Sequence, residues 1–159
     1  MKNILIISMI TLFFSCNDDD SPSSTAIDTG IGIKVLNSSG EDLLNTNTTN
    51  HFNGDNIRLF QLINGEITLI YNPNMDLPYG YSIETDTEGN NIVNAGFLPD
   101  ASHEHPEYIV KWSDTEQDTL KCEVEQFSNV LRFSKVWVNE ELQWESSSQT
   151  ERIVTVVID

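Results

Sequence analysis

The sequence predicts an all-β protein, a single antiparallel β-sandwich of immunoglobulin-like or related topology. Short segments alternate apolar and polar side chains, and Asn, Gly, Asp, Ser and Pro residues interrupt them about every 8–12 residues. After the first 15 residues, no window has a helical period. About nine or ten strands over this length suit two packed sheets. A lipocalin-like closed barrel is the alternative.

The clearest strands flank Asn64-Gly65. Both residue types tolerate the positive φ of a type I′ turn, so segments 57–63 and 66–71 are expected to pair as a hairpin. We expect the more apolar face of this hairpin to be the core face and the mixed face to be partly covered. The apolar face carries Phe60, Leu62, Ile67, Leu69 and Tyr71, and the apolar residues of the mixed face are Ile57, Leu59, Ile63 and Ile70.

A second hairpin is expected between segments 131–138 and 141–145. A two-residue turn pairs Trp137 with Leu142 and places Trp144 on the same face. We therefore expect both tryptophans in the core rather than on an exposed sugar-binding platform. The remaining expected strands are 31–36, 81–86, 92–97, 107–112, 119–125 and 152–158, and a long irregular stretch covers 37–56.

The N-terminal residues have the pattern of an export signal. Lys2 precedes an apolar run over residues 4–14, whereas a helix that crosses a bilayer needs about 20 apolar residues. Residues 12–16, Leu-Phe-Phe-Ser-Cys, resemble a bacterial lipobox. The resemblance implies a signal peptide over 1–15 and a diacylglycerol on Cys16, which then anchors the chain to a membrane.

An acidic segment follows Cys16. Its residues Asp18, Asp19 and Asp20 resemble the surface-export signals of Bacteroidota-type lipoproteins. The resemblance implies an outer-membrane lipoprotein of the cell envelope that is exposed at the surface, with a periplasm-facing anchor as the alternative. We expect residues 16–30 to form a lipidated, flexible acidic tether and residues 31–159 to form the β-sandwich domain.

The acidic composition argues against a nucleic-acid partner. The chain has 8 Lys and Arg against 25 Asp and Glu, which gives a formal net charge of −17. Binding to nucleic acid needs clustered basic side chains that replace counterions on phosphates. The expected partners are the membrane, through the lipid at Cys16, and a glycan or an envelope protein. No cofactor is expected.

No catalytic motif is present: the sequence has no G-x-S-x-G elbow, no H-E-x-x-H and no Gly-rich phosphate loop. We therefore expect no enzymatic activity. The predicted function is a lipid-anchored binding or adhesion module that contacts its partner through loops. The alternative is a structural or assembly subunit of an envelope complex, without a small ligand, whose interface is the mixed face of the first hairpin.

Aromatic residues beside turns are the candidate ligand contacts, because a glycan-binding site needs exposed rings. These residues are Phe52, Tyr79 and Tyr81. Phe52 is also expected to pin its loop to the core.

Two histidines are the candidate metal ligands. His103 and His105 lie two apart, so in an extended backbone both point to one side, and imidazole suits zinc or copper. The acidic run over 84–89 has oxygen ligands at the spacing of the first half of a calcium loop, but Ala95 stands at the closing position. The other interpretation of this run is a strand whose alternate acids face water.

Overall fold

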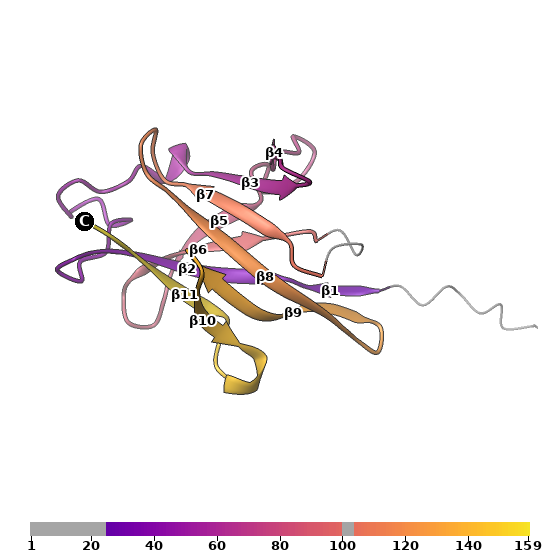
Figure 1. Cartoon of the computed structure of the whole chain (residues 1–159). Helices are drawn as coiled ribbons and strands as arrows, with labels where there is room; N and C mark the ends of the chain where they lie inside the picture. Colours follow the sequence, from indigo (N-terminus) through magenta and orange to yellow (C-terminus); the bar gives the residue numbers. More distant parts are fainter. Residues whose placement is uncertain (1–24, 100–103) are drawn as a thin grey trace, which may run out of the picture.

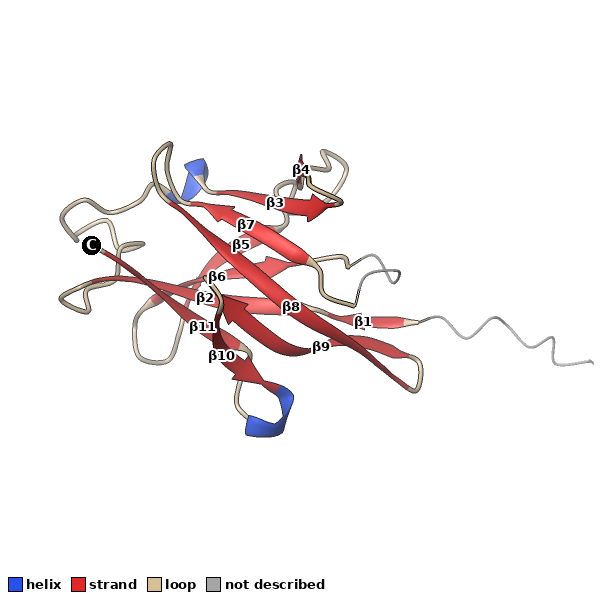
Figure 2. Ribbon diagram, in the orientation of Figure 1, coloured by secondary structure: helices blue, strands red, loops and turns tan. Residues whose placement is uncertain are grey.

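The computed structural model describes residues 25–99 and 104–159. Within these ranges the chain has no α-helix and forms two β-sheets that pack on each other (Figures 1 and 2). The predicted β-sandwich is therefore confirmed. The alternative of a closed barrel is wrong, because the strands divide between two separate sheets.

Sheet A has seven strands and sheet B has four. Sheet A contains, in spatial order, β1 (Ala26–Asp28), β9 (Val130–Val138), β8 (Gln117–Phe127), β7 (Glu107–Lys111), β3 (Arg58–Ile63) and β4 (Glu66–Leu69), with β10 (Glu141–Glu145) also paired to β9. Sheet B contains β11 (Ile153–Ile158), β2 (Gly30–Asn37), β6 (Asn91–Gly96) and β5 (Tyr81–Thr85). The pairs β1–β9 and β11–β2 are parallel and the other pairs are antiparallel. The sandwich is thus mixed rather than purely antiparallel.

Strand β1 lies inside the segment 16–30 that the sequence predicts as tether. Its three side chains are all exposed, so they give no alternation of apolar and polar residues. The strand forms through backbone pairing with β9, which a local pattern does not reveal. The ordered domain therefore begins before residue 31. Figure 1 shows that the start of β1 and the C-terminus lie at opposite ends of the sandwich.

The core lies between the inner faces of the two sheets. Its aromatic centre is Phe97, whose ring stacks on Tyr108 with a centroid distance of 4.1 Å, beside Phe133. The largest fully buried side chains are Trp112, Tyr108, Phe97, Phe133, Ile31, Ile33, Ile57, Leu59, Leu120, Val35, Val93 and Val110.

The first hairpin has the predicted register but presents its faces the other way round. Phe60 pairs with Leu69 as expected. However, Leu59 is fully buried on the mixed face, and Ile67 on the apolar face is 60 % exposed. At one end of β3 the mixed face points to the core. At the other end its polar Gln61 lines an open groove, where the side chain remains in contact with water. The predictions of the core face and of an interface on the mixed face are therefore both wrong.

Two β-bulges decide which face the second hairpin presents. The first lies in the β8–β9 pair, where the register shifts between Glu123 and Val124. As a result, Phe133 and Val136 both face the core, although they are three residues apart. Trp137 then lies on the outer face and is partly exposed, so its predicted core position is wrong.

The second bulge lies in β10, between Leu142 and Trp144. The predicted pair of Trp137 and Leu142 forms, but Trp144 pairs with Val136 and turns inward. Trp144 is buried as predicted, whereas Leu142 is 46 % exposed.

The long stretch from residue 37 to residue 56 is irregular, as expected, but it is tied to the core. Leu43 and Leu44 are buried, and the Phe52 N–H donates to the Leu43 carbonyl at 2.7 Å. Phe52 stacks on Trp112 with a centroid distance of 6.3 Å, which agrees with its predicted role in pinning the loop. The stretch ends in a short 3-10 turn, η1 (Gly54–Asn56), and a second such turn, η2 (Ser146–Ser148), follows β10.

Candidate functional site

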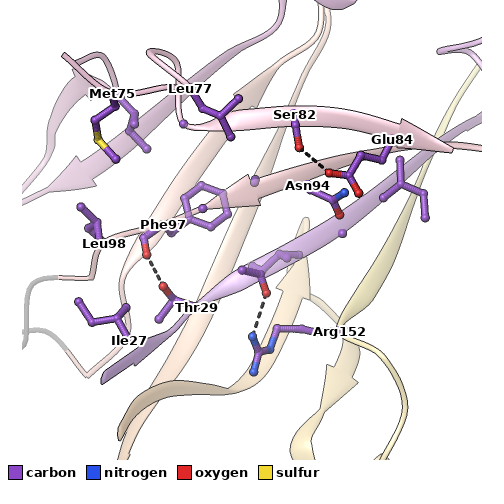
Figure 3. Close-up of a pocket in the computed structure, with 18 of the residues that line it drawn as sticks. Ile27, Thr29, Met75, Leu77, Ser82, Glu84, Asn94, Phe97, Leu98 and Arg152 are labelled. Atoms are coloured by element: carbon purple, nitrogen blue, oxygen red, sulfur yellow. Dashed lines mark hydrogen bonds between the residues drawn. The ribbon is translucent and has the colours of Figure 1, made fainter. Parts of the chain in front are cut away.

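A groove of about 1100 Å³ opens along sheet B at the end where β2 begins (Figure 3). We call it the sheet B groove. Its floor is bare because Gly30 of β2 pairs directly with Gly96 of β6, on the face of sheet B away from the core. A Cβ atom added at Gly30 would meet no heavy atom closer than the Ala95 carbonyl at 4.0 Å. The groove therefore exists because side chains are missing where two strands pair.

Apolar side chains form the walls of the groove. Met75 and Leu77 come from the segment between β4 and β5, and Figure 3 shows them on the side opposite Ile27. Leu98, which is 65 % exposed, extends the wall beyond the end of β6. The walls thus come from segments that are far apart in the sequence.

Two polar side chains of the groove, Ser82 and Arg152, have hydrogen-bond partners beside it. Ser82 Oγ donates to the Glu84 carboxylate at 3.2 Å. The Arg152 guanidinium donates to the Gly30 carbonyl at 2.8 Å and forms an ion pair with Asp28 at 3.1 Å. Its positive charge is therefore balanced, and the exposed Glu84 leaves this side of the groove acidic.

A second hollow of about 350 Å³ lies against the same strand, β5. We call it the Tyr79 pocket. It is lined by Asn53, Gly54, Asp55, Leu77, Pro78, Tyr79, Tyr81, Ser82 and Ile83. The sheet B groove and the Tyr79 pocket share Leu77, Pro78 and Ser82.

Two of the predicted ligand contacts, Tyr79 and Tyr81, line this pocket together. The Tyr81 hydroxyl donates to the carbonyls of Gly54 at 2.8 Å and Ile57 at 3.0 Å, and burial raises the pKa of this phenol above 10.0. The Tyr79 ring lies 4.0 Å below the Arg58 guanidinium. Tyr81 thus fixes the shape of the pocket, and Tyr79 offers the aromatic surface.

Phe52, the third predicted contact, lines neither hollow. An exposed aromatic residue that the sequence did not suggest lies at the groove instead. Tyr71 is 51 % exposed, lines the sheet B groove and packs on Tyr79 at 4.9 Å.

The metal predictions receive no support from the residues that the structure describes. His105 is exposed, and His103 lies outside those residues. Between residues 25 and 99 and between 104 and 159, no three His, Cys, Asp or Glu side chains are grouped to hold a metal ion. The zinc or copper site therefore stays a prediction.

The acidic run over 84–89 forms the end of β5 and the turn into β6. Asp86 Oδ1 accepts the backbone N–H groups of Glu88 at 2.9 Å and Asn90 at 2.8 Å. Lys34 lies 2.7 Å from Asp86, and its hydrogen bond holds the pKa of that carboxyl well below its usual range. The carboxylate is thus committed to the turn and to Lys34.

Comparison with protein-family models, curated proteins and solved structures finds no match to this chain. Among the residues described, no helix is long and apolar enough to span a bilayer. The signal peptide over 1–15 and the lipidation of Cys16 fall outside the described residues.

The glycine floor is the part of the site that sequence reasoning missed. A signal existed, since glycine inside a strand often marks a close approach by another group. Gly30 and Gly32 open β2, and Gly96 closes β6. What the sequence alone does not give is that Gly30 and Gly96 are direct neighbours in the sheet.

Proposed function

We propose that this chain is a non-catalytic binding module of the cell envelope, held to a membrane by a lipid on Cys16, that binds a glycan or a protein beside β5. The observation that carries the proposal is the sheet B groove. Its volume of about 1100 Å³ lies just above the usual range of ligand sites, which is about 300–1000 Å³. Its apolar walls and few polar groups are also typical of binding sites.

The engaged state of the polar groups favours binding over catalysis. An activated serine needs a base that a third group orients in turn, and among the described residues the Glu84 carboxylate has a hydrogen bond from Ser82 alone. In the groove, Glu84 accepts from Ser82, and Arg152 is held by Asp28 and a backbone carbonyl. These contacts orient the groove walls, and they favour a partner that is neutral or basic.

The path of the chain supports a partner close to the membrane. Ile27 and Thr29 line the groove, and Cys16 precedes Ala26 by ten residues (26 − 16). Ten residues span at most about 33–36 Å. An anchor on Cys16 would therefore keep the groove within about this distance of the bilayer surface.

Filling the groove tests the proposal. In Gly30→Leu the Cβ atom meets no heavy atom closer than 4.0 Å and the side chain extends over the bare floor, so we expect an unchanged melting temperature and a loss of binding. The control is Thr46→Leu, which adds a similar apolar side chain at an exposed position outside the groove. Both variants and the parent are melted with a panel of envelope glycans and envelope proteins. A ligand at about 100 times its Kd adds about 2.7 kcal/mol of stability to the parent. Equal ligand responses in Gly30→Leu and the parent would refute a site in this groove.

An assembly subunit is the second candidate function. The observation in its favour is the outward face of the first hairpin, where Ile67 is 60 % and Leu69 is 41 % exposed. Large exposed apolar patches often mark protein interfaces. Cross-linking in cells tests this role: Ile67→Lys should abolish a cross-linked partner, and a partner that persists in this variant would contradict it.

A further inference from the structure

Strand β5 forms one edge of sheet B and has β6 as its strand neighbour. Two hydrogen bonds show which of its main-chain groups face β6. The Gly96 N–H donates to the Gly80 carbonyl, and the Asp86 N–H donates to the Asn90 carbonyl, both at 2.8 Å. In an antiparallel pair, residues that face the neighbour alternate with residues that face away. Positions 80 and 86 bracket β5, so its even-numbered residues are bonded to β6.

The odd-numbered residues of β5 therefore point their N–H and C=O groups away from the sheet. These residues are Tyr81, Ile83 and Thr85. Within the described part of the chain, none of their main-chain groups takes part in a hydrogen bond to a loop, a turn or another strand. The side chains of Ile83 and Thr85 are exposed, so this edge is open to solvent at its far end.

The opposite edge of sheet B is covered at Thr155. The Gln143 side chain of β10 reaches across to β11, where its Nε2 donates to the Thr155 carbonyl at 2.9 Å and its Oε1 accepts the Thr155 N–H at 2.8 Å. Proteins commonly protect edges with proline, lysine or a bulge. The segment Tyr-Ser-Ile-Glu-Thr of β5 contains neither proline nor lysine, and its register with β6 is unbroken.

The sheet B groove and the Tyr79 pocket lie on opposite faces of sheet B beside β5. Glu84 faces the sheet B groove, and Tyr81 and Ile83 face the Tyr79 pocket. Side chains of an added strand also alternate between the two faces of the sheet. A strand paired with β5 would therefore place one set of side chains in the groove and the other set in the pocket, which is how strand addition combines affinity with specificity.

Charge selects the occupant. The chain carries a formal net charge of −17, and the exposed Glu84 lies on the groove side of β5, whereas the pocket side presents the apolar Leu77 and Ile83. A segment with Lys or Arg on the groove side and an apolar residue on the pocket side complements both surfaces. A second copy of this chain would bring the same negative charge to the edge and be repelled.

We propose that β5 is a strand-addition site, on which an extended, basic polypeptide segment of a partner protein pairs with the Tyr81–Thr85 edge. The proposal rests on the proposed binding function and names the partner as a polypeptide rather than a glycan.

The test uses the full lipidated chain in detergent micelles and a phage-displayed library of random ten-residue peptides. We expect enriched peptides that alternate basic and apolar residues. Ile83→Pro removes the outward N–H without breaking the ladder to β6, so it should weaken these peptides at least about tenfold, and Glu84→Lys should do so by a similar factor. Methylation of every peptide nitrogen should abolish binding, because the peptide then has no backbone N–H donors for the strand pairing.

Hydrogen exchange at the β5 amides distinguishes strand addition from binding in the groove alone, which would not change the exchange rates of these amides. The bound peptide should slow exchange of the Tyr81, Ile83 and Thr85 amides and leave the already bonded Ser82 and Glu84 amides unchanged. This alternating pattern needs only the parent protein, so it holds even where Ile83→Pro fails to fold.

Each other outcome overturns the proposal. Enriched peptides that bind Ile83→Pro equally well, or that protect no β5 amide, place the contact elsewhere. Protection of β5 that grows with protein concentration, without peptide, means that a second copy is the occupant. If glycans stabilise the parent but not Gly30→Leu and no peptide is enriched, strand addition is refuted. The proposed binding function then still stands. The absence of binding to any glycan, peptide or protein refutes both.

Discussion

Truncating one side chain on each face of the first hairpin tests the orientation that the structure gives it. Leu59→Ala and Ile67→Ala each remove three carbon atoms, from neighbouring strands. Leu59 is fully buried, so its truncation loses a transfer free energy of about 0.8 kcal/mol per carbon, roughly 2.4 kcal/mol in all. The cavity left in the core raises the total to about 3–4 kcal/mol.

Ile67 is 60 % exposed, so about 40 % of the same transfer free energy is at stake. Its truncation leaves no cavity, and the expected loss is about 1 kcal/mol. The two variants should therefore differ by about 2–3 kcal/mol in the free energy of unfolding. Equilibrium urea unfolding, followed by tryptophan fluorescence, should show this as a difference of roughly 1–2 M in midpoint.

The opposite ranking would refute the orientation. If Ile67→Ala were the more destabilised variant, the apolar face would be the core face, as the sequence pattern alone predicts. Equal losses would indicate that both faces are covered in solution. A changed m-value in either variant would signal a change in the denatured state, and the comparison would then move to a milder pair of truncations to Val.

Three further predictions follow from contacts described above. Lys34 holds the pKa of Asp86 below its ordinary value of 3.8, so their interaction stabilises the fold above about pH 4 and is lost as the pH falls toward the folded pKa. Lys34→Met should therefore lower the Tm at pH 7. The difference in Tm between this variant and the parent should shrink as the pH is lowered. Cys122 is fully buried, and burial raises the pKa of its thiol. In a Cys16→Ser background, a disulfide reagent should therefore label Cys122 only after urea unfolding. Labelling of the native protein within minutes would contradict this burial. A Cβ at Gly32 would lie 3.0 Å from Ile153 and 3.2 Å from Ile92, so Gly32→Ala should lower the stability by about 1–2 kcal/mol in thermal melts. Gly30→Ala should leave the stability unchanged. Equal melting temperatures for the two variants would count against the packing described for β2.

Local patterns were sufficient to predict where most strands lie. Alternation over 119–125 placed Leu120 and Cys122 in the core, and the Asn64-Gly65 turn set the register of its hairpin. Both signals depend on residues close together in the sequence. β1 was missed because its pairing partner is about 100 residues away and its own side chains are exposed.

The faces of the hairpins were harder to predict for a physical reason. Counting apolar residues assumes that a whole face shares one environment. The inner face of β3 instead passes from the core at Leu59 to an open groove at Gln61, so its mixed composition is what both environments require. A bulge similarly moves Trp137 outward, because one extra residue changes the phase of every side chain beyond it.

The site was only partly predictable. Turn residues on either side of Tyr79 and Tyr81 pointed to exposed rings, whereas both residues are half-buried and line one pocket. The sheet B groove depends on Gly30 meeting Gly96, which requires the order of strands in sheet B. Strand order is a property of the whole fold and has no local signature.

The position of β5 within sheet B also determines how the molecule would carry a mechanical load. Consider a partner held on β5 while the anchor holds the chain ahead of β1. The force then passes along the chain from β1 into β2 and across β6 to β5. Strands β2, β6 and β5 run side by side in sheet B, whereas β1 pairs with β9 of sheet A. Adjacent strands pulled along their length share the load among many hydrogen bonds at once, so they slide only when several break together. Strand β11, which pairs with β2 on the side away from β6, lies off this path. The domain would therefore behave as a stiff link between membrane and partner, with its strongest direction along the strands.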